Sequence, residues 1–204
     1  MKAKNPIIFI VDDEASVRRS FSLLLSAAGY SVESFARSDE FLARESYLGI
    51  GCILLDINLD GKSGLELQDE IREQFSCLPI IYITGIGNVP MSVQALKKGA
   101  INFLQKPVDE KQLIESVDEA LEKSKTLCAD QVEKSRLRSL FETLTPREIE
   151  IFLLVITGLL NKQIAGELNI AEQTVKIHRG KITEKLGVKS VAEMVRIAEK
   201  LHLL

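Results

Sequence analysis

Short apolar runs recur along the first half of the chain and constrain its fold more than any other feature. Four of these runs end in polar residues: residues 7–11 precede Asp12-Asp13, 53–55 precede Asp56, 80–83 precede Thr84, and 101–104 precede Lys106. Runs this short and apolar are typical of buried strands in a parallel sheet covered by helices on both faces. In such sheets ligands bind beyond the carboxyl ends of the strands. The polar residues after the runs are therefore predicted to share one site.

Strands and helices are predicted to alternate through residues 1–125. The strands fall at about 7–11, 31–35, 52–55, 80–84 and 101–104, and the helices at about 15–28, 39–46, 64–74, 89–98 and 110–124. Glycines end two of the helices, as expected for residues that adopt a left-handed conformation without strain. The alternation predicts an α/β fold with a doubly wound five-stranded parallel sheet and right-handed crossovers.

The length of 204 residues favours two domains. The first is predicted at 1–125. Residues 126–143 are polar with scattered apolar positions, which favours a helical linker over a flexible tether. A second, all-helical domain is predicted at 144–204.

Charge and composition narrow the class of protein. Residues 1–125 carry a net charge of −5, whereas residues 126–204 carry +2, which permits nucleic-acid binding. The apolar runs are far shorter than the ~20 residues that a membrane helix needs, and the N-terminus has no signal-peptide pattern. The three cysteines, Cys52, Cys77 and Cys128, lack metal-ligand spacing. Reduced thiols and a cytoplasmic location are therefore expected.

The three carboxylates at the strand ends require a compensating cation. Asp12, Asp13 and Asp56 would repel each other in a dry cleft, and a hard divalent ion with oxygen ligands, Mg²⁺ or Mn²⁺, relieves that repulsion. One carboxylate can then attack phosphorus and form an aspartyl phosphate. Lys106 and the hydroxyl of Thr84 are suited to hold phosphoryl oxygens. The competing interpretation is that Asp12 and Asp13 only cap the first helix.

A calcium loop overlaps this site but fails on inspection. Residues 56–61 match the first six positions of an EF-hand loop, yet the twelfth position is Leu67 in place of glutamate. The loop also follows a strand, where an EF-hand requires a helix. Calcium binding in that mode is rejected.

Taken together, these motifs make residues 1–125 similar to the receiver domain of two-component response regulators. The resemblance implies the sheet order 2-1-3-4-5 and a partner histidine kinase that phosphorylates Asp56. It further implies Asp12, Asp13, Asp56 and the main-chain carbonyl of Asn58 as magnesium ligands, Thr84 and Phe103 as a switch pair, and Lys106 as the phosphoryl-binding residue before a cis proline, Pro107.

Two positions keep alternatives open. Asp60 stands where the family commonly has proline. Its carboxylate either weakens phosphate approach, or alters metal affinity, or points to solvent. Phe103 is either a switch residue or an ordinary core aromatic.

The C-terminal pattern is that of a helix-turn-helix. Thr145-Pro146-Arg147-Glu148 is a capping box with proline at the first helical position. Asn161 is predicted to cap a short helix that reaches Leu168, and a longer helix is predicted at about 171–186. A short helix, a tight turn and a longer helix are characteristic of this motif.

The longer helix has a core face and an exposed face. Val175, Ile182 and Leu186 are predicted to face the core, and the opposite face carries Gln173, Lys176, Ile177 and Gly180. An exposed apolar residue at 177 suits contact with a thymine methyl group. Lys176 can reach a guanine edge or a phosphate, and the flanking cations Arg179, Lys181 and Lys185 suit phosphates. His178 is interpreted as a packed, hydrogen-bonded residue.

Residues 144–204 resemble the LuxR-type DNA-binding domain through the segments 144–148, 161–165, 174–179 and 185–188. With the receiver-like part, this implies the FixJ/NarL group of response regulators. The predicted DNA-contacting residues are Thr145, Asn161, Lys162, Gln173, Thr174, Lys176, Ile177, Arg179, Gly180, Lys181 and Lys185.

The sequence thus predicts a transcription regulator that is switched by phosphorylation and is no enzyme beyond slow self-phosphorylation and dephosphorylation. The resemblance implies a homodimer through residues 89–104 after phosphorylation and double-stranded promoter DNA as a partner. Binding to a membrane is not expected. Two alternatives are an aspartyl-phosphate phosphatase and a constitutive DNA-binding protein with a vestigial receiver.

Overall fold

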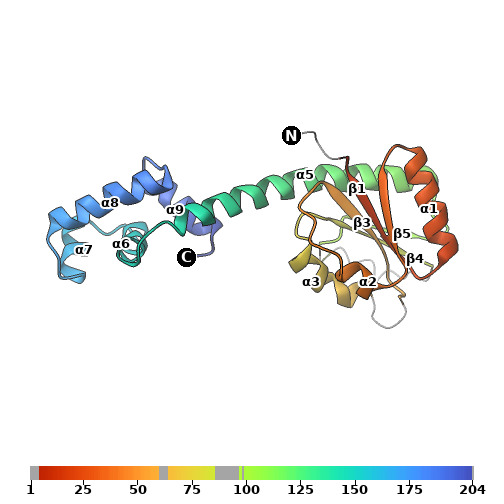
Figure 1. Ribbon diagram of the computed structural model, residues 1–204, viewed down its shortest axis with the longest axis horizontal. Helices are drawn as coiled ribbons and strands as arrows, with labels where there is room; N and C mark the ends of the chain where they lie inside the picture. The colour runs from red at the N-terminus through yellow and green to blue at the C-terminus, as the bar shows by residue number, and fades with distance from the viewer. Residues whose placement is uncertain (1–4, 60–63, 86–96, 98, 204) are drawn as a thin grey trace. The chain divides into compact units, whose positions relative to one another are not determined.

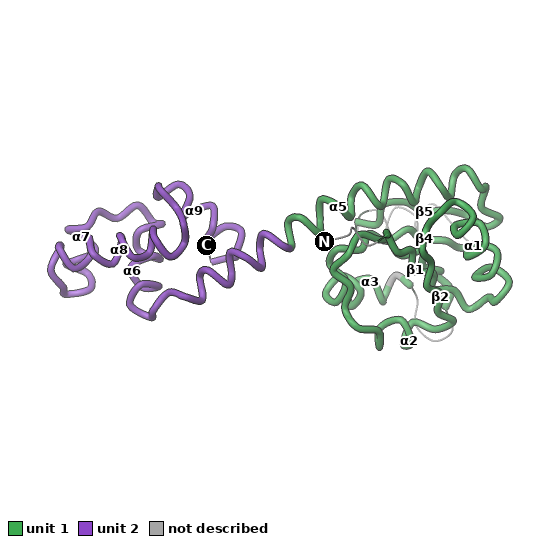
Figure 2. Tube along the Cα trace, turned by 45° about the horizontal axis from the view of Figure 1, so that its top comes forward, with its two compact units in different colours: residues 1–131 green, residues 132–204 purple. Residues whose placement is uncertain are grey.

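The computed structural model describes residues 5–59, 64–85, 97 and 99–203. The chain divides into two compact units, Met1–Gln131 and Val132–Leu204, which Figure 2 shows in different colours. The boundary falls inside the segment that the sequence predicts as a linker.

The first unit is built on a parallel sheet. Its strands are β1 (Ile7–Val11), β2 (Ser31–Phe35), β3 (Gly51–Asp56), β4 (Ile80–Thr84) and β5 (Asn102–Gln105), and its helices are α1 (Ala15–Ala27), α2 (Ser38–Leu42), α3 (Gly64–Gln74) and α5 (Glu110–Phe141). The strand order is β2-β1-β3-β4-β5, and every neighbouring pair is parallel. The predicted fold class and sheet order are confirmed.

Helices cover both faces of this sheet, with α1 and α5 on one side and α2 and α3 on the other (Figure 1). Side chains alternate between the faces because successive residues of a strand point in opposite directions. In β1, Phe9 and Val11 pack in one buried cluster, while Ile8 and Ile10 pack in the other. Each fully buried side chain of this kind stabilises the fold by roughly 1.5–3 kcal/mol.

Helix α2 is shorter than predicted. It ends at Leu42, whereas the sequence predicts a helix over 39–46. The guanidinium of Arg44 donates two hydrogen bonds to the Glu33 carboxylate on β2, at 2.8 and 3.0 Å, and lies over the rings of Phe9 and Tyr47. These tertiary contacts hold residues 44–47 outside a helical path. The helix predicted at 89–98 lies outside the described residues except for residue 97, and so does Asp60.

Helix α5 continues through the predicted linker without a break as far as Phe141. The helical linker is therefore confirmed. Within the described part of the chain, no helix has the length and apolar character that a membrane crossing requires.

The second unit is entirely helical, with α6 (Pro146–Ile156), α7 (Asn161–Glu167), α8 (Glu172–Leu186) and α9 (Val191–Lys200) around one apolar core. The capping box before α6 is confirmed: Thr145 Oγ1 accepts from the Glu148 amide at 3.3 Å, and Glu148 Oε2 accepts from the Thr145 amide at 2.8 Å. The prediction that Asn161 caps α7 is wrong. Leu160 holds the N-cap position, and its amide donates to Gln163 Oε1 at 2.8 Å.

Candidate functional site

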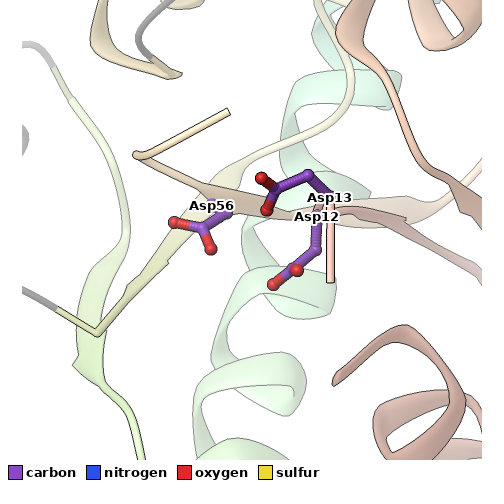
Figure 3. A group of neighbouring side chains, drawn as sticks. All are labelled: Asp12, Asp13 and Asp56. Atoms are coloured by element: carbon purple, nitrogen blue, oxygen red, sulfur yellow. The ribbon is translucent and has the colours of Figure 1, made fainter. Parts of the chain in front are cut away.

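Three carboxylates meet at the carboxyl ends of β1 and β3. Ligand oxygens of Asp12, Asp13 and Asp56 all lie within 4.8 Å of one another (Figure 3). Asp12 and Asp56 are almost fully buried, whereas Asp13 is half-buried. The strand ends predicted from the sequence therefore do converge on an acidic site.

Local turns fix the two buried carboxylates. The Glu14 amide donates to Asp12 Oδ1 at 2.8 Å, and the Asn58 amide donates to Asp56 Oδ1 at 2.9 Å. Each aspartate thus uses one oxygen to close the turn that follows its strand, a common role for this side chain. The second oxygen of each side chain remains available to a cation.

That cation is Lys106, which follows β5. Its Nζ lies 2.8 Å from Asp12 Oδ2, 2.6 Å from Asp56 Oδ2 and 2.9 Å from Glu14 Oε1. The Lys106 amide also donates to the carbonyl of Thr84 at 2.8 Å, and the Lys106–Pro107 peptide is cis. The ammonium group therefore joins the ends of β1, β3 and β5.

Charge and burial act on these groups in opposite directions. Burial raises the pKa of Asp12, and the hydrogen bond from Lys106 only partly offsets it. For Lys106, burial acts to lower the pKa, but the hydrogen bonds to Asp12, Asp56 and Glu14 outweigh it and raise the pKa. Lys106 is consequently held in its charged form beside Asp56.

Thr84 and Phe103 lie on β4 and β5. Thr84 is buried at the end of β4, and its Oγ1 accepts a hydrogen bond from Asn58 Nδ2 at 3.3 Å. Phe103 is half-buried and packs against the cluster on the α2 and α3 face. Thr84 therefore belongs to the group around Asp56 through Asn58, while Phe103 contacts the core.

Two residues at this site were missed from the sequence. Glu14 contacts Lys106, and Arg18 Nη1 donates to the main-chain carbonyls of Asp12 at 2.7 Å and Asp13 at 2.9 Å. The signal for Glu14 was its place directly after the acidic pair. Arg18 lies in the first turn of α1, whose N-terminus begins right after this acidic turn, so its side chain reaches back to the turn.

The backbone after β3 is closely packed. A Cβ atom added to Gly64 would lie 2.4 Å from the carbonyl oxygen of Asp56, and the Gly64 amide donates to the Ile57 carbonyl at 2.9 Å. Glycine at this position therefore allows α3 to begin against the segment that carries the Asp56 carboxylate.

The donor set fits a metal ion. Asp12, Asp13 and Asp56 offer oxygen ligands only, which hard divalent cations such as Mg²⁺ prefer over softer metals. The acidic group is thus able to hold a metal ion.

In the second unit, α8 has the two faces that the sequence predicts. Val175, Ile182 and Leu186 are buried, and Ile177 is 52% exposed. Gln173, Lys176, Gly180 and Lys181 are exposed as well, as is Lys162 on α7. Space next to Gly180 is open, because no atom lies within 4 Å of an added Cβ. Thr145 is exposed, and Asn161, Thr174 and Arg179 are half-buried.

Two of the predicted phosphate-binding cations are engaged inside the unit. Lys185 Nζ lies 2.6 Å from Glu148 Oε2 and donates to the Thr143 carbonyl at 2.9 Å. Arg179 Nη1 donates to Asn161 Oδ1 at 2.8 Å. The C-terminal end of α8 is thereby joined to the start of α6, and its middle to the start of α7.

The ion pair with Lys185 sets the ionisation of Glu148. The Glu148 side chain is 3% exposed, and the hydrogen bond from Lys185, together with that from the Thr145 amide, lowers its pKa from 4.5 to about 2. His178 is half-buried, as expected for a packed residue. The expected hydrogen bond is not found at its Nδ1, which is buried without a partner among the described residues.

Comparison with known proteins assigns each half of the chain to a family. The response regulator receiver domain family matches residues 8–118, and the LuxR family of bacterial regulatory proteins matches residues 142–198. Nodulation protein W of Bradyrhizobium diazoefficiens is 42% identical over 197 residues, covering 97% of this chain and 87% of that protein. The transcriptional regulatory protein FixJ of the same organism is 32% identical over 97% of this chain and 96% of its own.

Solved structures extend the likeness. The response regulator StyR matches with a TM-score of 0.71 and 42% identity, covering 97% of this chain and 100% of its own. Full-length FixJ from B. japonicum matches with a TM-score of 0.57 and 32% identity, covering all of both chains.

These matches, on a receiver fold with an acidic strand-end site and a helix-turn-helix, define the class as a two-component response regulator that binds DNA. The chain belongs to the FixJ/NarL family of response regulators, with a LuxR-type DNA-binding domain.

Proposed function

We propose that Asp56 is the phosphoacceptor and that its phosphorylation by a partner histidine kinase controls binding of the second unit to promoter DNA. The observation that carries this proposal is the position of Lys106 Nζ, 2.6 Å from Asp56 and 2.8 Å from Asp12. A buried carboxylate beside a fixed ammonium and a second carboxylate suits phosphoryl transfer, which depends mainly on positioning and charge.

In the proposed step, Asp56 Oδ2, the oxygen paired with Lys106, attacks phosphorus and forms an acyl phosphate. The bond between phosphorus and the kinase histidine breaks, and the electron pair leaves on the imidazole nitrogen. Asp12, Asp13, Asp56 and the main-chain carbonyl of Asn58 would hold Mg²⁺ or Mn²⁺, which supplies positive charge against the phosphoryl oxygens. Lys106 then exchanges its contact with Asp56 for one with a phosphoryl oxygen, and the Thr84 hydroxyl donates to another.

The signal is proposed to leave the site through Thr84 and Phe103. Movement of Thr84 toward the phosphoryl group breaks its bond with Asn58 and opens space into which Phe103 turns. We assign the dimer interface to residues 89–104, most of which lie outside the described residues. A dimer holds two copies of α8 on half-sites about one DNA turn apart, which raises affinity without new contacts within either copy.

On DNA, the exposed face of α8 is proposed to enter the major groove. Ile177 would contact a thymine methyl group, Gln173 and Lys176 base edges, and Gly180 would permit close approach of the backbone. Arg179 and Lys181 are assigned to phosphates, together with residues around the helix starts: Thr145, Asn161, Lys162 and Thr174. Lys185 is assigned a positioning role through Glu148 in place of the phosphate contact expected from the sequence.

The test compares Asp56→Asn with the wild type in binding to DNA selected from a random pool. Acetyl phosphate is expected to raise wild-type affinity by about tenfold or more through dimerisation, and to leave the affinity of Asp56→Asn unchanged. Asp130→Asn, which changes an exposed carboxylate on α5, is the matched control and should respond like the wild type. Equal stimulation of Asp56→Asn and wild type would contradict the proposal.

Two other functions make different predictions for the same protein. An aspartyl-phosphate phosphatase would turn over small phosphomonoesters many times. A ligand that binds the native state raises its melting temperature. A vestigial receiver would not bind Mg²⁺ and a phosphate mimic, so its melting temperature would not change.

A further inference from the structure

Two of the three cysteines lie together at the edge of the sheet opposite to Asp56. Cys77 precedes β4, and Cys128 lies on α5, both in the first unit. Ser124 Oγ donates to the main-chain carbonyl of Cys77 at 2.7 Å and lies 4.0 Å from Cys128 Sγ. One serine therefore holds both cysteines at the amino ends of the strands.

The Cys128 thiol also acts on the Cys77 thiol. Burial, followed by a hydrogen bond with the Cys128 thiol, raises the pKa of Cys77 to about 12. The Cys128 thiol donates to the Gly49 carbonyl at 3.3 Å. The pair is thus held by the segments before β3 and β4 and by α5.

Only one of these two thiols is exposed to solvent. Cys77 is 1% exposed, whereas Cys128 is half-buried and open to a small solute. Cys52 is fully buried within the cluster that faces α1 and α5. A reagent in solution therefore meets Cys128 first, and Cys77 is the neighbour that can complete a reaction begun there.

We propose that Cys77 and Cys128 form a redox-sensitive dithiol, which a low-molecular-weight disulfide such as glutathione disulfide closes to an intramolecular disulfide. The Cys128 thiolate attacks one sulfur of glutathione disulfide, whose S–S bond breaks and releases one glutathione. The sulfur of Cys77 then attacks Cys128 in the mixed disulfide, the bond between Cys128 and glutathione breaks, and the second glutathione leaves as a thiol that has taken up the Cys77 proton. Two protein thiols are oxidised, and one glutathione disulfide is reduced to two thiols.

The cross-link would join α5 to the segment before β4, whereas the Asp56 site lies at the carboxyl ends of the strands. The reaction consumes none of the groups at the Asp56 site. Disulfides in reducing compartments are mostly transient and sensory, and a half-exposed thiol with a buried partner fits such a role. The dithiol is therefore a second covalent input to the first unit, separate from phosphorylation.

The experiment incubates the native full chain with glutathione buffers of rising disulfide content, then quenches with acid, alkylates the free thiols and maps the peptides by mass. The wild type should lose two hydrogen atoms and yield a single cross-link, between the peptides of Cys77 and Cys128. Cys52→Ser should close at the same buffer ratio. Cys77→Ser should stop at a glutathione adduct on Cys128, and Cys128→Ser should stay reduced.

A parallel reaction in urea separates chemistry from geometry, because there all three cysteines are accessible and several pairings form. Circular dichroism of each serine variant verifies that it is folded. A native wild-type chain that stops at the Cys128 adduct, stays reduced where the unfolded chain oxidises, or links Cys52 would overturn the proposal.

Discussion

The acidic site of the first unit and the helix α8 of the second unit handle charge in opposite ways. Around Asp56, carboxylates are taken out of water and brought within 4.8 Å of each other, with Lys106 among them. On α8, Lys176 and Lys181 are exposed to solvent. The buried charged group is the carboxylate of Glu148 on α6, which pairs with Lys185. In the first arrangement the carboxylates repel one another, and we expect an added phosphoryl group and a cation to change how these groups are paired. The second leaves cations exposed on a helix that the Lys185–Glu148 pair joins to α6.

This contrast assigns different tasks to cations that look alike in the sequence. Lys181 and Lys185 lie four residues apart on α8, yet one is exposed and the other bridges to α6. Substituting each of them separately tests whether their roles differ.

The largest effect on stability is expected from Lys185→Met. It removes the partner of a buried carboxylate while keeping the aliphatic stem, and breaking such a pair costs about 3 kcal/mol, the low end for buried ion pairs. Urea unfolding of the second unit should register this loss. The DNA affinity of the folded fraction should keep its dependence on salt, because no phosphate contact is removed.

The matched control is Lys181→Met. Its stability should stay within about 0.5 kcal/mol of the wild type, and the slope of log affinity against log salt should fall by about 1. If Lys185→Met lowers the salt slope and spares stability, the assigned positioning role is wrong.

A smaller loss is expected from Gly64→Ala, since the added Cβ meets the Asp56 carbonyl at 2.4 Å. Crowding of this kind typically costs about 1–3 kcal/mol, and the shift of backbone should also slow phosphoryl uptake at Asp56. Thermal unfolding and phosphoryl uptake from acetyl phosphate measure the two effects.

Gly180→Ala provides the opposite case. Open space surrounds it on α8, so alanine should stabilise the helix by up to ~1 kcal/mol and weaken DNA binding where the backbone approaches the groove.

For Gly64→Ala, an unchanged rate of phosphoryl uptake from acetyl phosphate would show that the close packing after β3 does not position Asp56.

The last effect is a dependence of stability on pH. The pKa of Glu148 lies at about 2 in the folded chain and at 4.5 without its partners, so the ion pair stabilises the second unit fully above about pH 4.5. This contribution is lost as the pH falls toward about 2, because the unfolded chain takes up the proton first. Glu148→Gln keeps the cap but lacks the charge and should show none of this dependence.

Urea unfolding at about pH 5 and about pH 3 measures it, with the wild type compared to Glu148→Gln at each pH. The difference in unfolding free energy between the two proteins should shrink at the lower pH. A constant difference would mean that protonation of Glu148 does not weaken the pair.

The sequence predicts the sheet and the acidic site well because both depend on local patterns. Each strand is a short apolar run, and the polar residue that ends it must lie at the carboxyl edge. Asp12, Asp56 and Lys106 therefore meet as expected, although they are far apart along the chain.

The features that could not be predicted from the sequence depend on contacts between residues that are distant along the chain. Lys185 reads as an exposed cation until Glu148, which belongs to a different helix, is placed beside it. Helix α2 ends early because Arg44 reaches Glu33 on the neighbouring strand. Glu14 belongs to the site only through its ion pair with Lys106, which follows β5. Helical spacing alone encodes none of these contacts.

The site of phosphoryl attachment shows directly whether Asp56 is the phosphoacceptor. The full chain is incubated with acetyl phosphate and Mg²⁺, the acyl phosphate is trapped by borohydride reduction, and the peptides are mapped by mass. We expect a single modified residue, Asp56, with no modification in Asp56→Asn and a strong loss without Mg²⁺. Modification at Asp12 or Asp13, or equal labelling of Asp56→Asn, would contradict the account.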